Sequence, residues 1–129
     1  MHGVDRAVRR YEQVVDGCPP GPSKVALEAF LPRVDLVARA ATATGRAAQA
    51  ETPSADMRIP NGPEGRARDT HRRLTRTATA CAQAAEAAAM IRVEVDPGAP
   101  TPVDPARVAA VERAVRKAEE LAGLVPPPA

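Results

Sequence analysis

Four stretches of the chain carry apolar residues at alternating steps of three and four positions. This spacing places the apolar side chains on one face of an α-helix, so it predicts four amphipathic helices that pack side by side. Much of each face is alanine, and the chain has one tyrosine, one phenylalanine and no tryptophan. The four apolar faces are Val4, Val8, Tyr11 and Val15; Leu27, Leu31, Val34, Ala38, Ala41 and Ala48; Ala67, Leu74, Ala78, Cys81, Ala85, Ala88 and Ile91; and Val108, Val111, Val115, Ala118, Ala122 and Val125.

The first two predicted helices are separated by a segment rich in proline and glycine. The first helix is expected over residues 3–16, because residues 17–22 lack backbone donors at three prolines and favour extended geometry. The second helix is expected over residues 24–50, with Ser23 as its N-cap. Pro32 lies inside it, so the helix either kinks near residue 28 to 31 or splits into two pieces. We expect the kink, because the apolar face keeps its phase across the proline.

The third predicted helix begins at residue 64 or 66 and ends at about residue 93, after a polar loop over residues 51–65. Its centre is almost pure alanine, the residue with the highest helix propensity. Asp104 precedes a proline that suits the first helical position, which predicts a fourth helix from there to Leu121. A glycine two positions further on is expected to close this helix.

These elements predict an all-α fold, an alanine-rich up-down four-helix bundle with a proline kink in its second helix. The chain has 129 residues, which suits one domain, and we expect a single helical-bundle domain over residues 1–125 followed by a disordered proline-rich tail at 126–129. An alternative arrangement is an elongated hairpin of the second and third helices, with the other two docked loosely against it.

The composition affects the expected stability of this bundle. Hydrophobic residues make up 44% of the chain, but alanine supplies much of that share, and an alanine buries little area. Replacing leucine by alanine along a face forgoes on the order of 2 kcal/mol per position, partly regained by closer helix approach. We therefore expect either a monomer of marginal stability or a dimer.

Charge and cysteine content restrict the location and chemistry. The formal net charge is only +2, and Lys24 and Lys117 are the only lysines, a bias typical of GC-rich bacterial genomes. Cys18 and Cys81 form neither a disulfide framework nor a metal site, because no second ligand stands at metal-binding spacing. No apolar run reaches the ~18 residues of a membrane span, so a cytoplasmic protein without a membrane partner is expected.

The strongest local feature is a group of basic residues at the start of the third predicted helix. Positive charge there opposes the helix dipole, so an anion or an acidic surface would stabilise the group. Asp69 stands four residues before Arg73 and neutralises part of it, which is the ordinary arrangement of a solvated face. No stacking aromatic residues accompany the cluster, so it supports at most phosphate contact without sequence readout. The candidate anion-binding residues are Arg66, Arg68, His71, Arg72, Arg73 and Arg76.

Catalytic chemistry has no candidate residues in this chain. The two histidines and two cysteines are not arranged as a nucleophile with its base, and the glutamates lack the Glu-x-x-His pairs of a di-metal bundle. We expect no enzyme activity, catalytic residue, metal or cofactor. The leading hypothesis is a helical interaction or adaptor protein, or a small regulatory protein, that pairs with itself or with a helical partner. The alternative is nucleic-acid or anion binding through the arginine group.

Overall fold

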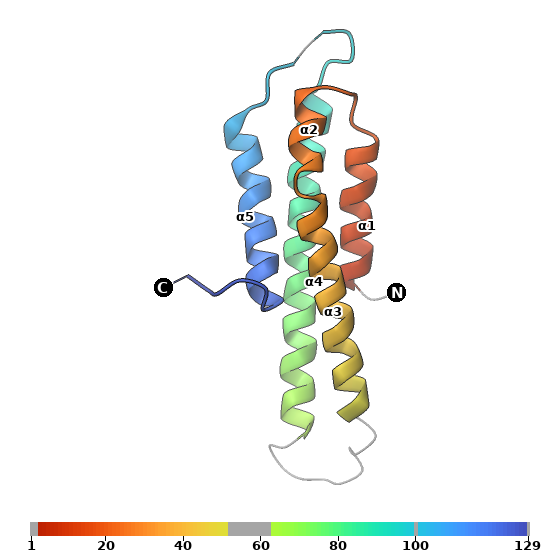
Figure 1. The fold of residues 1–129 in the computed structure, drawn as a ribbon, viewed down its shortest axis with the longest axis vertical. Helices are drawn as coiled ribbons and strands as arrows, with labels where there is room; N and C mark the ends of the chain where they lie inside the picture. Colours follow the sequence, from red (N-terminus) through yellow and green to blue (C-terminus); the bar gives the residue numbers. More distant parts are fainter. Residues whose placement is uncertain (1–2, 52–62, 100, 129) are drawn as a thin grey trace.

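The computed structural model describes residues 3–51, 63–99 and 101–128, and these contain helices and no strand (Figure 1). The prediction of an all-α fold is confirmed. Most of the loop predicted over residues 51–65 lies outside the described residues, as does Ala129 of the predicted tail. The helices are α1 (Gly3–Asp16), α2 (Pro22–Glu28), α3 (Leu31–Glu51), α4 (Pro63–Glu94) and α5 (Pro105–Leu121).

Helices α2 and α3 follow one another in a single column, so the five helices form four columns (Figure 1). The start of α1 lies against the middle of α4, where a Cβ added to Gly3 would come 3.2 Å from the Cβ of Ala78. Arg107 near the start of α5 pairs with Glu94 at the end of α4 at 2.6 Å. Helix α4 therefore runs parallel to α1 and antiparallel to α5.

Helix α4 is the centre of the packing, because it contacts α1 and α5 far more extensively than α3 contacts any helix. Small side chains allow this close approach on two sides of α4. Of the residues predicted for its apolar face, four are buried, and Ala80 and Ala84 are buried as well because two neighbours widen the covered face. The buried predicted residues are Cys81, Ala85, Ala88 and Ile91.

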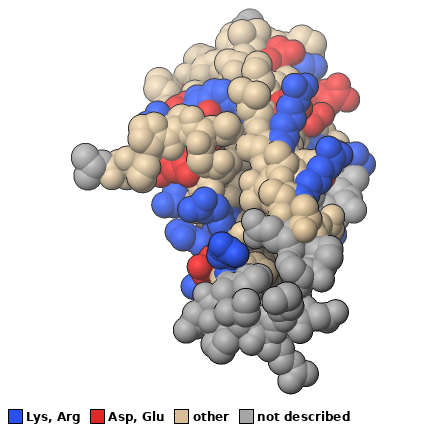
Figure 2. Space-filling view, turned by 60° about the horizontal axis from the view of Figure 1, so that its bottom comes forward, with Lys and Arg blue, Asp and Glu red and all other residues tan. Residues whose placement is uncertain are grey.

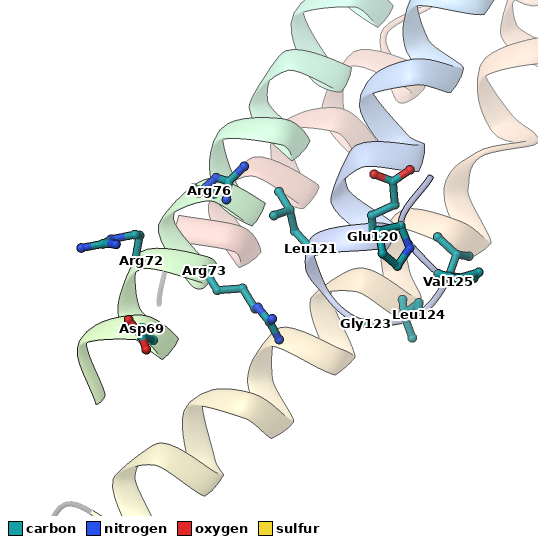
Figure 3. Close-up of a pocket in the computed structure, with 11 residues that line it drawn as sticks. Asp69, Arg72, Arg73, Arg76, Glu120, Leu121, Gly123, Leu124 and Val125 are labelled. Carbon is teal, nitrogen blue, oxygen red and sulfur yellow. The ribbon is translucent and has the colours of Figure 1, made fainter. Parts of the chain in front are cut away.

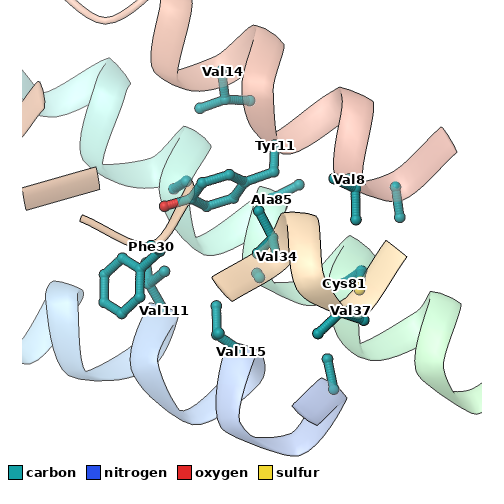
Figure 4. Packing of buried hydrophobic residues seen from close by; sticks show 14 of the residues in the cluster. Val8, Tyr11, Val14, Phe30, Val34, Val37, Cys81, Ala85, Val111 and Val115 are labelled. Atoms are coloured by element: carbon teal, nitrogen blue, oxygen red, sulfur yellow. The ribbon is translucent and has the colours of Figure 1, made fainter. Parts of the chain in front are cut away.

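Helix α3 closes the core from the side opposite α4 with larger side chains. Val34 and Val37 of α3 point inward, and Tyr11 of α1 and Val111 of α5 meet them there (Figure 4). All four are at most 1% exposed. The alanines of α4 let α1 and α5 approach it closely, whereas the larger residues of α3 hold that helix further from its neighbours. Helix α3 therefore has fewer close backbone contacts.

The boundary between α2 and α3 lies where the sequence predicts a disturbance. Pro32 has no N–H to donate to the carbonyl of Glu28, so α2 ends there. The carbonyl of Phe30 accepts from the N–H groups of Arg33 and Val34, both at 3.0 Å, and starts α3. Pro32 thus occupies the first turn of a helix, where an N–H is not needed. The buried positions keep their spacing across the boundary: Leu27, Phe30, Val34, Val37 and Ala41.

The helix ends agree with the sequence in one case and correct it in another. The Asp104 carboxylate accepts a 2.9 Å hydrogen bond from the N–H of Ala106, as expected of the predicted N-cap. Ser23 is not the N-cap of α2, because that helix already begins at Pro22 and its N-cap is Gly21. Ser23 lies inside the first turn and is buried. Among the helices of the described ranges, none has the length and apolarity needed to cross a membrane.

Candidate functional site

The predicted anion-binding residues lie in about the first four turns of α4. These turns extend past the beginning of α1, which lies against Ala78 (Figure 1). Basic side chains gather near this end of the molecule, with acidic side chains among them (Figure 2). All six candidates are exposed: Arg66, Arg68, His71, Arg72, Arg73 and Arg76.

Three of the six candidates line a pocket together with the segment that follows α5. This arginine pocket is formed by Arg72, Arg73 and Arg76 on one side and by residues 120–121 and 123–127 on the other, with a volume of about 630 Å³. The side chain of Arg73 extends toward this C-terminal segment, whereas that of Arg72 points away from it (Figure 3). The other three candidates, Arg66, Arg68 and His71, do not line the pocket.

The C-terminal segment reaches the pocket because α5 ends in a sharp turn. The backbone of Gly123 has a φ of 77°, a conformation that residues other than glycine rarely adopt. The N–H of Leu124 donates to the carbonyl of Glu119 at 2.9 Å, and that of Gly123 donates to Glu120 at 3.1 Å. This pattern is a Schellman turn, and it reverses the chain at the end of α5. The predicted role of Gly123 in ending the helix is confirmed.

The charges in the arginine pocket are mixed. Asp69 and Glu120 line it beside the arginines, and Glu120 lies 3.7 Å from Arg116 of its own helix. The expected pair of Asp69 with Arg73 is not among the ion pairs of the described residues. The lining has guanidinium and carboxylate groups but no thiol, hydroxyl or imidazole, so it offers chemistry for holding an anion.

The most strongly connected charged group of the described chain was not predicted. Arg33 of α3 donates to Glu112 at 2.6 and 3.0 Å and to Glu119 at 2.7 and 3.1 Å, both on α5. Glu112 therefore pairs across helices, whereas Arg116 of its own helix lies near Glu120. The hydrogen bonds that Arg33 donates, to Glu119 and then to Glu112, raise the pKa of Arg33, and the bonds that Glu112 accepts from Arg33 lower the pKa of Glu112. The sequence signal for this group was the seven-residue spacing of Glu112 and Glu119, which places both carboxylates on one side of α5.

Helix α3 also carries a second apolar face, which the sequence reading missed. It lies opposite the buried face and continues onto α2, and its larger members are open to solvent: Val25 is 66% exposed and Leu36 is 52% exposed. We call this face the outer row. The steps between its members are again three or four residues, so they share one side of the helix. The outer row consists of Val25, Ala29, Pro32, Leu36, Ala40, Ala43, Ala47 and Ala50.

Both cysteines are buried and free. Burial raises the pKa of the Cys81 thiol to about 12 and also raises the pKa of Cys18, where Lys24 and Arg92 oppose the change. A thiol of raised pKa has little reactive thiolate near neutral pH. The cysteines therefore act as small core residues.

Comparison with protein-family models, with curated proteins and with solved structures finds no match to this chain. The function is therefore argued from the surfaces of the molecule itself. Among the described residues, the outer row and the arginine pocket each offer a binding surface.

Proposed function

We propose that this chain is a non-enzymatic helical interaction module, an adaptor or small regulatory protein that pairs with itself or with a helical partner. The outer row carries this proposal. It has the periodicity of a helix-packing face, and it includes valine and leucine side chains more than half exposed. A partner helix laid along it would bury these side chains.

The composition of the core supports the same proposal. Helix α4 is held largely through alanines, each of which contributes little apolar area, so covering the outer row would add stability. We further propose that these helices act as an up-down four-helix bundle, in which α2 and α3 together serve as one member that is kinked at Pro32. The proposed location is the cytoplasm of a bacterial cell.

A photo-crosslinking experiment tests the proposed function. A photoreactive phenylalanine analogue replaces Leu36 in the outer row, and in a control variant it replaces the exposed Gln83 of α4. Irradiation in cells should give adducts from position 36, either with a second copy or with a helical protein, and few adducts from position 83. Equal yields at the two positions, or no adduct at position 36, would contradict the proposal.

The arginine pocket favours a second candidate function, the binding of an anion or of nucleic-acid phosphates. Arg72, Arg73 and Arg76 line this pocket, with Arg73 extending toward the C-terminal segment, and guanidinium groups bind phosphate oxygens well. Contacts with about four phosphates of duplex DNA would give a log-log salt slope near −3 to −4. The Arg72→Gln/Arg73→Gln variant should reduce this slope by about two.

The matched control for this second candidate neutralises Arg113 and Lys117, which are exposed on α5 and lie outside the pocket. The Arg113→Gln/Lys117→Gln variant removes the same amount of charge and should keep the parent slope. If the parent protein does not bind labelled DNA or inorganic phosphate at low salt, or if both variants behave alike, the pocket does not bind these anions.

A further inference from the structure

The outer row is bordered on one side by an ordered series of charges. Glu28, Asp35, Arg39 and Arg46 are all exposed, and they stand at steps of seven, four and seven residues. These steps place the four side chains along the same edge of the row. Two acidic residues lie toward the start of the column and two basic residues toward its end, and Lys24 precedes them four residues before Glu28. We call this series the charged edge.

The symmetry of a helix pair determines which edges meet. When two identical helices pack antiparallel about a two-fold axis perpendicular to them, the same edge of each helix lies on the same side of the interface. The two edges then run in opposite directions. An edge with acids in its first half and bases in its second half is complementary to itself in that arrangement.

We propose that the outer row binds a second copy of this chain, with the two α2–α3 columns antiparallel and the two-fold axis crossing the outer row at the level of residue 37 along the column. This inference rests on the proposed function, because it names the partner and the geometry of that same surface. With the axis there, Glu28 meets Arg46 of the second copy and Asp35 meets Arg39. Both pairs are centred on residue 37, and the outer row, from residue 25 to residue 50, is centred at nearly the same place.

The existing ion pair on the edge is compatible with this interface. Asp35 lies 3.0 Å from Arg39 of the same helix, and the two side chains are 55% and 75% exposed. Approach of the second copy adds an opposite charge to each of them. The two Asp35 and two Arg39 side chains would then form a ring of alternating charges around the two-fold axis.

A parallel pair of columns is not complementary. In that arrangement the charged edge of one copy meets the opposite edge of the other. The opposite edge has Ala26, Arg33 and Thr44, and Arg33 is occupied by Glu112 and Glu119 of α5. No acidic partner would face the arginines, so the charge order selects the antiparallel pair.

The size of the surface predicts a weak dimer. The 26 residues from Val25 to Ala50 span about 39 Å at 1.5 Å per residue. A face of that length and roughly one helix wide buries on the order of 500 Å² per copy, near the lower limit for a specific interface. Alanine supplies five of the eight residues of the row, so the dissociation constant is expected on the order of 10 µM.

A charge-exchange experiment tests the proposal on the full chain. One variant carries Glu28→Arg and Asp35→Arg, which makes the whole edge basic, and the other carries Arg39→Glu and Arg46→Glu, which makes it acidic. Sedimentation velocity over a series of concentrations should find a dimer for the parent and a monomer for each variant alone. An equimolar mixture of the two variants should restore the dimer, because every pair across the axis is again of opposite sign.

A control variant reverses two charges away from the interface, Arg113→Glu and Lys117→Glu on α5, and should dimerise like the parent. The proposal is overturned if the parent stays monomeric up to about 0.5 mM, if the two charge variants dimerise alone, or if their mixture does not. Circular dichroism checks folding. If a reversal prevents it, Arg39→Gln/Arg46→Gln replaces that variant, with dimer affinity expected to fall about ten-fold, and unchanged affinity overturns the proposal.

This experiment separates two kinds of failure. If the parent dimerises but the edge variants do not obey the charge rule, another surface or register is used and the proposed function still stands on its crosslinking result. If crosslinks from Leu36 identify only a different helical protein, the interaction function holds and self-pairing is wrong. If neither crosslinks nor dimers form, both proposals fail.

Discussion

The hydroxyl of Tyr11 in α1 donates a 2.7 Å hydrogen bond to the backbone carbonyl of Leu27 in α2. This carbonyl lies in the last turn of a short helix, where helix carbonyls lack part of their normal partners. Among the described residues, the N–H of Phe30 also reaches it, at 3.3 Å, and the N–H of the capping residue Ala29 is directed both to it and to the carbonyl of Val25. Since both Tyr11 and Leu27 are 0% exposed, no water replaces the hydroxyl, and the bond ties α1 to the α2–α3 boundary.

Replacement of Tyr11 by phenylalanine should therefore destabilise the fold while preserving the packing of the ring. The variant leaves a buried carbonyl with only the backbone N–H groups of Ala29 and Phe30, so the free energy of unfolding should fall by about 1–2 kcal/mol. Urea denaturation followed by circular dichroism measures it, and the m-value should stay constant. An unchanged midpoint would show that the hydroxyl contributes nothing net.

The buried Cys81 thiol makes stability depend on alkaline pH. Its pKa is raised to about 12 in the folded state, from about 9 in the unfolded chain, so above pH 9 the unfolded state loses its proton first. Stability is therefore fully present below pH 9 and falls toward pH 12, by up to about 1.4 kcal/mol per pH unit. Urea midpoints at pH 8, 9.5 and 10.5 should show a smaller decline for Cys81→Ala than for the parent. Parallel declines would contradict this assignment.

Removing only one charge of the ion pair between α3 and α5 should cost more stability than removing both charges. Arg33→Met leaves Glu119, whose side chain is 11% exposed, without its ionic partner, and should reduce the free energy of unfolding by about 2–3 kcal/mol. Combining Arg33→Met with Glu119→Leu removes the unpaired charge and should recover part of that loss. Thermal melts of the two variants decide the matter, and a double variant no more stable than Arg33→Met alone would count against it.

Much of the fold could be predicted because its strongest signals are local. The bounds of α1 and α5, the N-cap at Asp104 and the closing Gly123 follow from residues within a few positions of each helix end. The disturbance at Pro32 also follows from one missing N–H. The prediction of Ser23 as the N-cap is wrong because Pro22 is itself a good first helical residue, so α2 begins before Ser23 rather than after it.

Which helices lie side by side, and where the candidate sites form, depends on contacts between helices that the sequence pattern does not reveal. Alanine occurs on every face of α3 and α4, so periodicity does not reveal that α4 is covered on two sides or that α3 has an outer row. Arg33 reads as an exposed residue until α5 is placed beside it. The arginine pocket needs the reversed segment after Gly123, which brings residues distant in sequence to Arg73.

Two glycines in contrasting conformations should respond to alanine with opposite signs. Gly123 has a φ of 77°, so Gly123→Ala introduces strain and should lower the free energy of unfolding by about 1 kcal/mol. Gly45 lies inside α3, and a Cβ there has no neighbour within 4 Å, so Gly45→Ala should raise it by about 0.5–1 kcal/mol. Urea midpoints that move in the same direction for both would refute the conformational argument.

The close approach of α4 to its neighbours should make its alanines intolerant of larger residues. Ala88 is 0% exposed on the covered face of α4, so Ala88→Leu must displace a neighbouring helix and should lower the free energy of unfolding by about 2–3 kcal/mol. Ala82 is exposed on the same helix, and Ala82→Leu should change it by less than about 0.5 kcal/mol. Alanine and leucine have similar helix propensities, so the difference between the two variants isolates packing. If Ala88→Leu proves as stable as Ala82→Leu in calorimetry, the helices of the core do not pack at alanine distance.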